Sequence, residues 1–423
     1  MIRDKNNVLE AIKEWNFWES SPEVGIIRGD YLNKLGDLMS RGGGQVVVVT
    51  GARRSGKSYI LRQMVKKMVD SIVRKEDTVY LNFEDVRLGV NNVNDLDEVY
   101  QMVIKHLGFG GQKIVFLDEV QLVEGWERWV RTMHDLRKAR VVISGSNSRI
   151  LTSDLGTKLT GRHIDMRVFP LSLMEFVSFH NGEDAQQYLR NYLVKGGFPL
   201  PVLEPKSAKQ LLLDYFTDIV ARDVAGRYNV RKLDRLMETA KYAVSNYSCS
   251  ITFNSIARYL ELKEDTVRNY LEYLEEAFLV FQLHRFSYKP KEVEKSPRKI
   301  YCIDTGLAGV VGLQAGQNIG RLAENAVFLH LLRKEKEFYY WKDTQQHEVD
   351  FVVVEGNKPI SAIGVCWDMS NPKTKSREVK SMVYGLKDLG LNEGLFLVEN
   401  SQKDEVVDGK VIRFKSLGEW LMT

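Results

Sequence analysis

The chain has 423 residues, of which 44% are hydrophobic and 27% are charged, and its formal net charge is +4. This length exceeds what one hydrophobic core usually supports, so we expect two to four domains. The small net charge does not by itself indicate a nucleic-acid partner.

The cysteines and the apolar segments bear on the compartment. The three cysteines, Cys249, Cys302 and Cys366, are far apart in the sequence, which favours a reducing compartment and argues against a cysteine metal site. The first residues are charged and carry no apolar signal core. No segment approaches the roughly 20 apolar residues that a membrane span needs. We therefore expect a cytoplasmic protein without a membrane partner.

A short amphipathic helix is predicted over residues 30–40, and glycines 42–44 lead from it into the first strand. Arg28 precedes this helix. It could lie near a bound nucleotide, but a solvated side chain is the simpler interpretation.

A glycine-rich loop then joins a predicted strand to a predicted helix. Residues 46–50 (VVVVT) are apolar β-formers, residues 59–73 have a helical pattern, and GARRSGKS between them has the G-x-x-x-x-G-K-S spacing. In such a loop the backbone N–H groups surround a phosphate, and the helix start adds a partial positive charge. Lys57 can reach the β- and γ-phosphates, and the Ser58 hydroxyl suits Mg²⁺. We expect a nucleoside triphosphate to bind at Gly51, Ala52, Arg53, Arg54, Ser55, Gly56, Lys57 and Ser58.

Two carboxylates complete this pattern. Residues 78–83 predict a second strand, and residues 113–117 predict a third that ends in Asp118 and Glu119. An apolar strand that ends in two carboxylates, about 60 residues after a P-loop, is typical of a Walker B motif. Asp118 would hold Mg²⁺ with Ser58, through water. Glu119 would polarise the attacking water.

Two further residues are candidates for catalysis. Residues 140–144 predict a fourth strand, and Asn147, or else Ser146, follows its end, where a polar side chain could orient water; a plain turn is the alternative. Arg162 precedes a fifth strand-like run. It could meet a γ-phosphate in cis or from a neighbouring subunit, or be a surface arginine in a turn.

The sequence resembles the archaeal and bacterial AAA-type P-loop ATPases that carry a C-terminal domain of unknown function. The similar segments span most of the chain: GARRSGKS (51–58), VYLNFED (79–85), FLDEVQ (116–121), SGSNS (144–148), LTGR (159–162), FPLSLMEF (169–176), YLVKGGFP (192–199) and RKIYCIDTGL (298–307). The resemblance implies ATP as the nucleotide and supports a functional role for Arg162. It does not imply a substrate.

The second half predicts a helical lid over residues 171–228 and a winged helix over residues 229–297. The winged helix would comprise helices 253–260 and 265–277 and a wing within residues 278–288. The second of these helices is too acidic to read DNA, with five carboxylates between Lys263 and Glu276. The wing segment 284–299 is basic, so contact with DNA phosphates and contact with a protein both remain open.

The last domain, residues 298–423, has the element order of a restriction-endonuclease-like fold. In that fold a helix Glu, a strand Asp and an E-x-K motif surround Mg²⁺. Glu324 and Asp350 match the first two positions, but Gly364, Val365 and Cys366 stand in place of E-x-K. We therefore expect a nuclease-like domain without nuclease activity.

Together these features predict an α/β protein with an AAA-type P-loop core (residues 1–170), a helical lid, a winged helix and a nuclease-like α/β domain. We expect an ATP-hydrolysing switch or motor that uses Mg²⁺ and acts on nucleic acid or another macromolecule, as a homo-oligomer or with a protein partner. An ATP-dependent signalling or assembly scaffold is the alternative. The lost E-x-K motif argues against a third possibility, an ATP-dependent nuclease.

Overall fold

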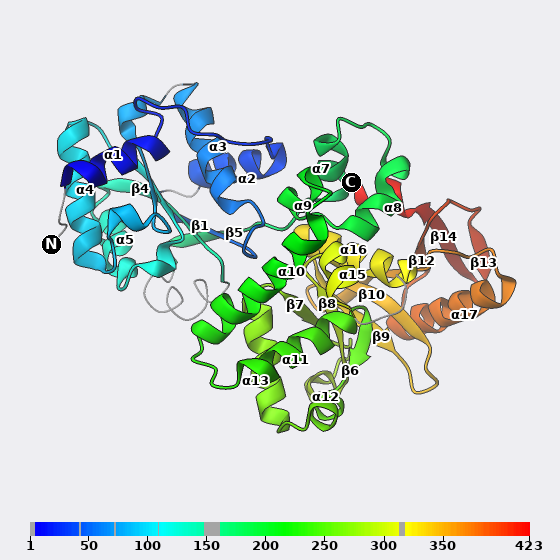
Figure 1. The fold of residues 1–423 in the computed structure, drawn as a ribbon. Coiled ribbons are helices and arrows are strands. Elements are labelled where there is room, and N and C mark those ends of the chain that lie inside the picture. The colour runs from blue at the N-terminus through cyan, green and yellow to red at the C-terminus, as the bar shows by residue number, and fades with distance from the viewer. Residues whose placement is uncertain (1–4, 42–43, 72, 109, 148–160, 313–317) are drawn as a thin grey trace. The chain divides into compact units, whose positions relative to one another are not determined.

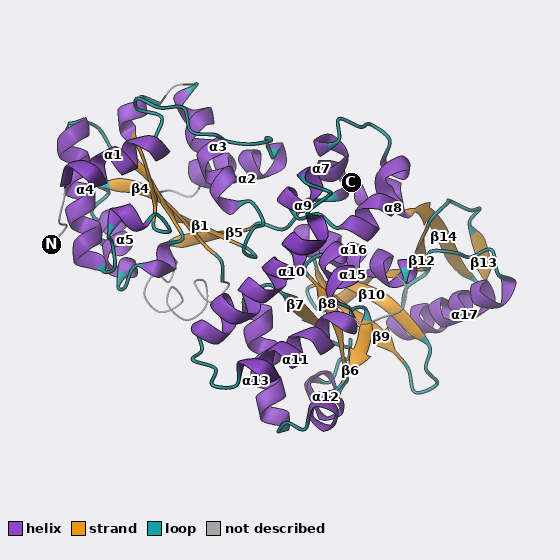
Figure 2. Cartoon of the chain, in the orientation of Figure 1, coloured by secondary structure: helices purple, strands orange, loops and turns teal. Residues whose placement is uncertain are grey.

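The computed structural model describes residues 5–41, 44–71, 73–108, 110–147, 161–312 and 318–423 (Figure 1). It divides into two units, Met1–Val168 and Phe169–Thr423, and each is described by itself. The first unit alternates strands with helices along the chain, whereas the second begins with a long run of helices (Figure 2). In the described ranges no helix is long and apolar enough to cross a membrane.

The first unit is built on a five-stranded parallel sheet. Its spatial order is β2-β3-β4-β1-β5, and the strands are β1 (Val46–Thr50), β2 (Thr78–Asn82), β3 (Lys113–Asp118), β4 (Ala139–Gly145) and β5 (His163–Arg167). Every residue of β1 and β3 is buried, as expected for parallel strands covered on both faces. The strands expected from the sequence are confirmed, and with them the α/β class.

Helices cover both faces because successive strand residues point to opposite sides. Val46 and Val48 belong to the core that includes α1 (Lys5–Trp15), α4 (Val93–Leu107) and α5 (Trp126–Asp135). Val47 and Val49 belong to the core that includes α2 (Gly29–Arg41) and α3 (Lys57–Val69). The sheet is thus the middle layer of three, and its carboxyl edge is where sheets of this kind place ligands.

The outer edge of β2 is closed by the end of α1 and the segment that follows it. The Asn16 amide accepts from the Tyr80 N–H (2.8 Å) and donates to the Tyr80 carbonyl (2.9 Å), and the Trp18 indole donates to the Thr78 carbonyl (2.8 Å). Pairing the backbone in this way protects an edge strand from other chains.

The second unit begins with helices around a small antiparallel sheet. The helices are α7 (Leu173–Phe179), α8 (Ala185–Lys195), α9 (Pro199–Leu203), α10 (Ala208–Asp218), a π-helix (Ile219–Gly226), α11 (Leu233–Ser245), α12 (Phe253–Leu260) and α13 (Glu264–Glu276). The sheet has the order β6-β8-β7, with β6 (Cys249–Ile251), β7 (Val280–Leu283) and β8 (Arg298–Cys302).

The wing expected within residues 278–288 is not formed as predicted. Its first strand, β7, pairs with β8 rather than with residues 284–288. The backbone of His284 and Phe286 instead bonds to Tyr340 in another sheet, and α14 (Pro290–Lys295) lies between that segment and β8. Long-range pairing of this kind has no local sequence signal.

The last part of the unit is a six-stranded mixed sheet with the order β13-β14-β12-β11-β10-β9. Strands β9 (Glu337–Lys342), β10 (Glu348–Glu355) and β11 (Lys358–Val365) form an antiparallel meander, and β11 pairs in parallel with β12 (Glu393–Val398). The other elements are α15 (Thr305–Val311), α16 (Ile319–Arg333), α17 (Pro372–Leu389), β13 (Glu405–Val407), β14 (Lys410–Ser416) and α18 (Leu417–Leu421).

Two sequence segments far apart meet at the buried carboxylate of Asp304. It accepts from the N–H of Gly197 (2.6 Å) and from the N–H of Leu307 (2.8 Å), where it caps α15. A Cβ on Gly306 would lie 2.0 Å from the carbonyl of Lys195, so only glycine allows this approach. The glycine turn that follows α8 is therefore a packed joint to α15.

Replacing Asp304 with Asn tests this joint. The amide NH₂ would face a backbone N–H in place of an acceptor, so we expect the free energy of unfolding to fall by about 1–3 kcal/mol. Urea denaturation measures this change. Asp408→Asn, at an exposed carboxylate that pairs with Lys387, is the control and should change stability by less than about 0.5 kcal/mol. Equal losses in the two variants would contradict this role.

Candidate functional site

The loop between β1 and α3 lies at the carboxyl edge of the parallel sheet, and its shape requires glycine at its start. Gly51 has a φ of 154°, and a Cβ there would lie 2.1 Å from the Val168 carbonyl. Gly56, directly before α3, has a φ of 102°. Arg54 is exposed, and the Arg53 guanidinium pairs with Glu84 (2.9 Å), which follows β2.

The Lys57 side chain is buried beneath this loop and only 4% exposed. Its ammonium donates to the carbonyls of Gly51 (3.0 Å) and Ala52 (3.1 Å) and lies 3.6 Å from a Glu119 carboxylate oxygen. Neutral carbonyls are weaker partners for an ammonium than charged phosphate oxygens. Lys57 is therefore placed to exchange them for a phosphate.

Asp118, at the end of β3, is fully buried. It accepts hydrogen bonds from the hydroxyls of Tyr80 (2.5 Å), Ser144 and Ser58. Burial raises the pKa of Asp118, and the neighbouring charge of Glu119 raises it further, while the three hydroxyls lower it. The structure thus brings together Ser58 and Asp118, the two residues expected to hold Mg²⁺. The hydroxyl and carboxylate oxygens of these residues are ligands that this ion prefers.

Glu119 follows Asp118 in a left-handed conformation, with a φ of 54°. Its N–H donates to the Ser144 hydroxyl (3.0 Å), and its carboxylate accepts from the Gln121 amide (2.5 Å). Gln121 also lies 3.4 Å from the Ser146 hydroxyl. The Glu119 carboxylate is therefore held between Lys57 and Gln121.

Asn147 and Ser146 are buried just beyond the end of β4. They lie at the same edge of the sheet as the loop, as the sequence predicted. Residues 159 and 160 of the LTGR motif lie outside the described residues.

Arg162 lies at the other edge of the sheet. Its carbonyl accepts from the N–H of Val46 at the start of β1 (2.8 Å), and its guanidinium pairs with Asp135 at the end of α5 (3.0 Å). The whole length of β1, about 16 Å for five residues, separates this edge from the loop. The structure does not bring Arg162 to the loop of its own chain.

Arg28 contacts the phosphate-binding loop and stabilises it. The expectation that the Arg28 side chain is solvated is therefore wrong. This side chain is 2% exposed, and its guanidinium donates to the carbonyl of Ser55 (2.8 Å). Gln63 of α3 holds the segment that precedes Arg28 in place. Its side-chain amide donates to the carbonyls of Val24 and Ile26 (both 2.7 Å). Three large apolar side chains are exposed here: Ile26 and Ile27 of this segment and Tyr59 at the start of α3.

Sequence reasoning missed three residues of this site, namely Tyr80, Gln121 and Ser144. All three stand in segments that the resemblance had singled out. Their roles depend on which strands are neighbours: β2 and β4 both flank β3, so Tyr80 and Ser144 reach Asp118 from either side.

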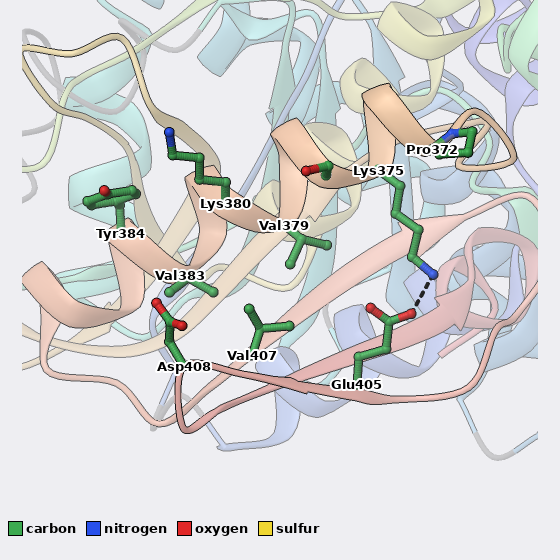
Figure 3. A pocket seen from close by; sticks show the side chains of 10 residues that line it. Pro372, Lys375, Val379, Lys380, Val383, Tyr384, Glu405, Val407 and Asp408 are labelled. Atoms are coloured by element: carbon green, nitrogen blue, oxygen red, sulfur yellow. Dashed lines mark hydrogen bonds and ion pairs between the residues drawn. The ribbon is translucent and has the colours of Figure 1, made fainter.

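A second hollow lies in the other unit, between α17 and the hairpin β13–β14 (Figure 3). Its volume is about 560 Å³. Val379, Val383 and Val407 point into it, and Lys375 pairs with Glu405 (2.5 Å) at its rim. Aliphatic walls with charges that pair with each other are typical of a solvated surface groove, and we assign it no chemistry.

The comparisons with known proteins agree with this site. Residues 43–177 match the family model described as an AAA domain. An uncharacterised protein of Methanocaldococcus jannaschii is 33% identical over 82% of this chain and 80% of its own length, and one of Haemophilus influenzae is 30% identical over 77% and 83%. The chain belongs to the family of these proteins. Its first unit contains a P-loop domain of the AAA type.

The rest of the chain matches models without a known function. Residues 186–317 and 319–417 match two domains of unknown function (DUF8612 and DUF4143). Among solved structures, Saccharomyces cerevisiae Hsp104 with ADP is similar at a TM-score of 0.33 and 17% identity, over 64% of this chain and 41% of that one. Aeropyrum pernix ORC1 with DNA is similar at 0.30 and 13%, over 73% and 96%. These scores are too low to support an argument about fold or function.

Arg28→Ala tests the brace on the loop. Without the guanidinium the Ser55 carbonyl loses a charged donor and the loop loosens, so we expect the affinity for ATP to fall about tenfold, which corresponds to about 1.4 kcal/mol. Calorimetric titration with ATP measures this, and a melting curve confirms that the variant is folded. Arg131→Ala, at an exposed arginine that pairs with Asp135, should bind ATP like the wild type. Unchanged affinity in folded Arg28→Ala would contradict this role.

Proposed function

We propose that the protein binds ATP with Mg²⁺ at residues 51–58 and hydrolyses it to ADP and phosphate. The observation that carries this proposal is the convergence of Lys57, Asp118 and Glu119 at one buried edge of the sheet. An ammonium and two carboxylates within reach of a phosphate-binding loop are the groups that phosphoryl transfer to water requires.

Each residue has a separate role in this proposal. Lys57 leaves the loop carbonyls and binds β- and γ-phosphate oxygens, while the backbone N–H groups of the loop hold the phosphate chain. Asp118 and the Ser58 hydroxyl would hold Mg²⁺, which when bound would neutralise charge on the phosphates. Glu119 orients the attacking water and accepts its proton as the water oxygen bonds to the γ-phosphorus. The bond from the γ-phosphorus to the bridging oxygen breaks, and ADP leaves with that oxygen. Asn147 lies at the same edge and orients this water.

The nucleotide base is expected to lie on the segment that Gln63 fastens to α3. Ile26, Ile27 and Tyr59 are exposed there, and the Arg28 brace connects this segment to the phosphate loop. An aromatic ring and two aliphatic side chains suit the face of a purine.

Arg162 could contribute to catalysis only from a neighbouring subunit, because in its own chain it lies at the far edge of the sheet. An arginine that acts in trans would couple hydrolysis to assembly, which supports a homo-oligomeric switch or motor over an isolated enzyme. A scaffold whose assembly is set by ATP binding alone is the alternative.

The macromolecule on which the second unit acts stays open, and the structure lowers the support for DNA. The basic segment 284–299 presents less charge than the sequence suggested, because Lys299 is buried, Arg298 lies 3.7 Å from Glu294 and Lys289 pairs with Glu292 (2.9 Å). We therefore favour a protein partner for this surface.

The element order of the last domain supports the proposed nuclease-like fold. The order is α16, β9, β10, β11, α17 and β12, in which an antiparallel meander is followed by a parallel crossover. Glu324 lies on α16 and Asp350 on β10. At the position of the missing glutamate, a Cβ on Gly364 would lie 2.4 Å from the Phe396 ring, so the packing there excludes a longer side chain. This supports a role in binding or assembly rather than in cleavage.

Glu119→Gln separates binding from hydrolysis. The amide keeps the size of the side chain but cannot accept the proton from water, so we expect turnover to fall at least about 100-fold while ATP still binds. Phosphate release and ATP titration measure the two effects. Glu98→Gln on α4, whose carboxylate pairs with Lys5 at the surface, should hydrolyse ATP like the wild type. Wild-type turnover in Glu119→Gln would rule out this assignment.

A further inference from the structure

A lysine occupies the centre of the carboxylate cluster in the last domain. Lys299 comes from β8, in the small antiparallel sheet, and its side chain is 3% exposed. Its ammonium lies 2.9 Å from Glu324 of α16, 2.7 Å from Glu348 of β10 and 2.9 Å from Asp350 of β10. An ammonium has three N–H donors, so these three carboxylates use all of them.

Each carboxylate of the cluster has a second partner, which for Glu324 contacts the same oxygen as Lys299 and for Asp350 and Glu348 contacts the other oxygen. The Tyr301 hydroxyl donates to Glu324 (2.7 Å), the N–H of Val365 donates to Asp350 (2.9 Å), and Lys342 pairs with Glu348 (3.0 Å). Burial lowers the pKa of Lys299, but the charges of Asp350 and Glu324 outweigh this effect and hold it well above its usual value. The surrounding carboxylates therefore favour the charged form of the lysine.

The cluster does not fit the Mg²⁺ that a nuclease-like fold implies. The carboxylate oxygens lie 2.7–2.9 Å from the Lys299 nitrogen at the centre of the cluster. Mg²⁺ requires its oxygen ligands at about 2.0–2.1 Å. Position 364 adds no ligand to the cluster, because a Cβ there would point at Phe396 and Met382 in the core beside α17. Cys366 stands where the fold has a lysine, and burial raises the pKa of its thiol to about 11.

We propose that Lys299 is a built-in cation that takes the place of a divalent metal and closes this centre. The ammonium donates to the three carboxylates, and it ties β8 to α16 and β10. The carboxylates at the positions of a metal site thereby form fixed ion pairs with Lys299, and these ion pairs connect the small sheet to the large one. This proposal concerns the second unit and does not depend on ATP hydrolysis.

The proposal predicts that removing the lysine restores a cation site. Lys299→Ala leaves three carboxylates around a small cavity, so millimolar Mn²⁺ should raise its melting temperature by about 4 °C or more, as linkage to a bound ion requires. The wild type should show no such shift, and neither should the double variant Lys299→Ala/Asp350→Asn. Lys342→Ala removes the other lysine partner of Glu348 and is the matched control, which should behave like the wild type.

A folded Lys299→Ala variant whose melting temperature does not respond to Mn²⁺ would overturn the proposal. If this variant does not fold, Lys299→Met, which keeps the apolar stem, replaces it. Calorimetric titration of the wild type with Mn²⁺ tests the proposal even if no Lys299 variant folds. Mn²⁺ binding by the wild type that is lost in Asp350→Asn would contradict the proposal. The proposal predicts that the wild type has no Mn²⁺ site of this kind. Mg²⁺-dependent DNA cleavage by the wild type that Asp350→Ala abolishes would also overturn it.

Discussion

The candidate ATP site depends on one buried ammonium. Lys57 is held by two carbonyls of its own loop and by the carboxylate of Glu119, and a buried charge without such partners would be strongly destabilising. The same partners are weak enough to be exchanged for phosphate oxygens. The loop that provides them requires glycine where it passes the Val168 carbonyl, and Arg28 fixes its far side. Binding and the integrity of the loop are therefore linked through a few backbone carbonyls.

Two of the buried lysines in the described residues, Lys57 and Lys299, show how the charge of the partners separates an exchangeable site from a closed one. Lys57 has two neutral acceptors at 3.0 and 3.1 Å and a carboxylate at 3.6 Å. Lys299 has three carboxylates within 2.9 Å. Charge-assisted bonds of this kind are roughly twice as strong as neutral ones. The first arrangement favours ligand binding, and the second favours a fixed connection between sheets.

The sequence predicted the parallel sheet and the positions of Lys57, Ser58, Asp118 and Glu119, because a strand, a glycine loop and a helix are local patterns. Its failures depend on long-range pairing. Residues 283–288 have the composition of a strand, but their backbone pairs with Tyr340 near the edge of the large sheet. Arg28 has the sequence context of a solvated side chain and becomes buried because α3 fastens its segment. Lys299 was counted as a basic wing residue, and only the fold shows that three carboxylates surround it.

The most direct test of the central claim is phosphate release from ATP by the full-length protein, measured with and without Mg²⁺ and compared with Lys57→Ala. The proposed site predicts release that requires Mg²⁺ and falls to background in Lys57→Ala, because Lys57 provides the ammonium that binds the β- and γ-phosphate oxygens. A melting curve shows whether the variant is folded. Phosphate release by folded Lys57→Ala at the wild-type rate would contradict the assignment of the site.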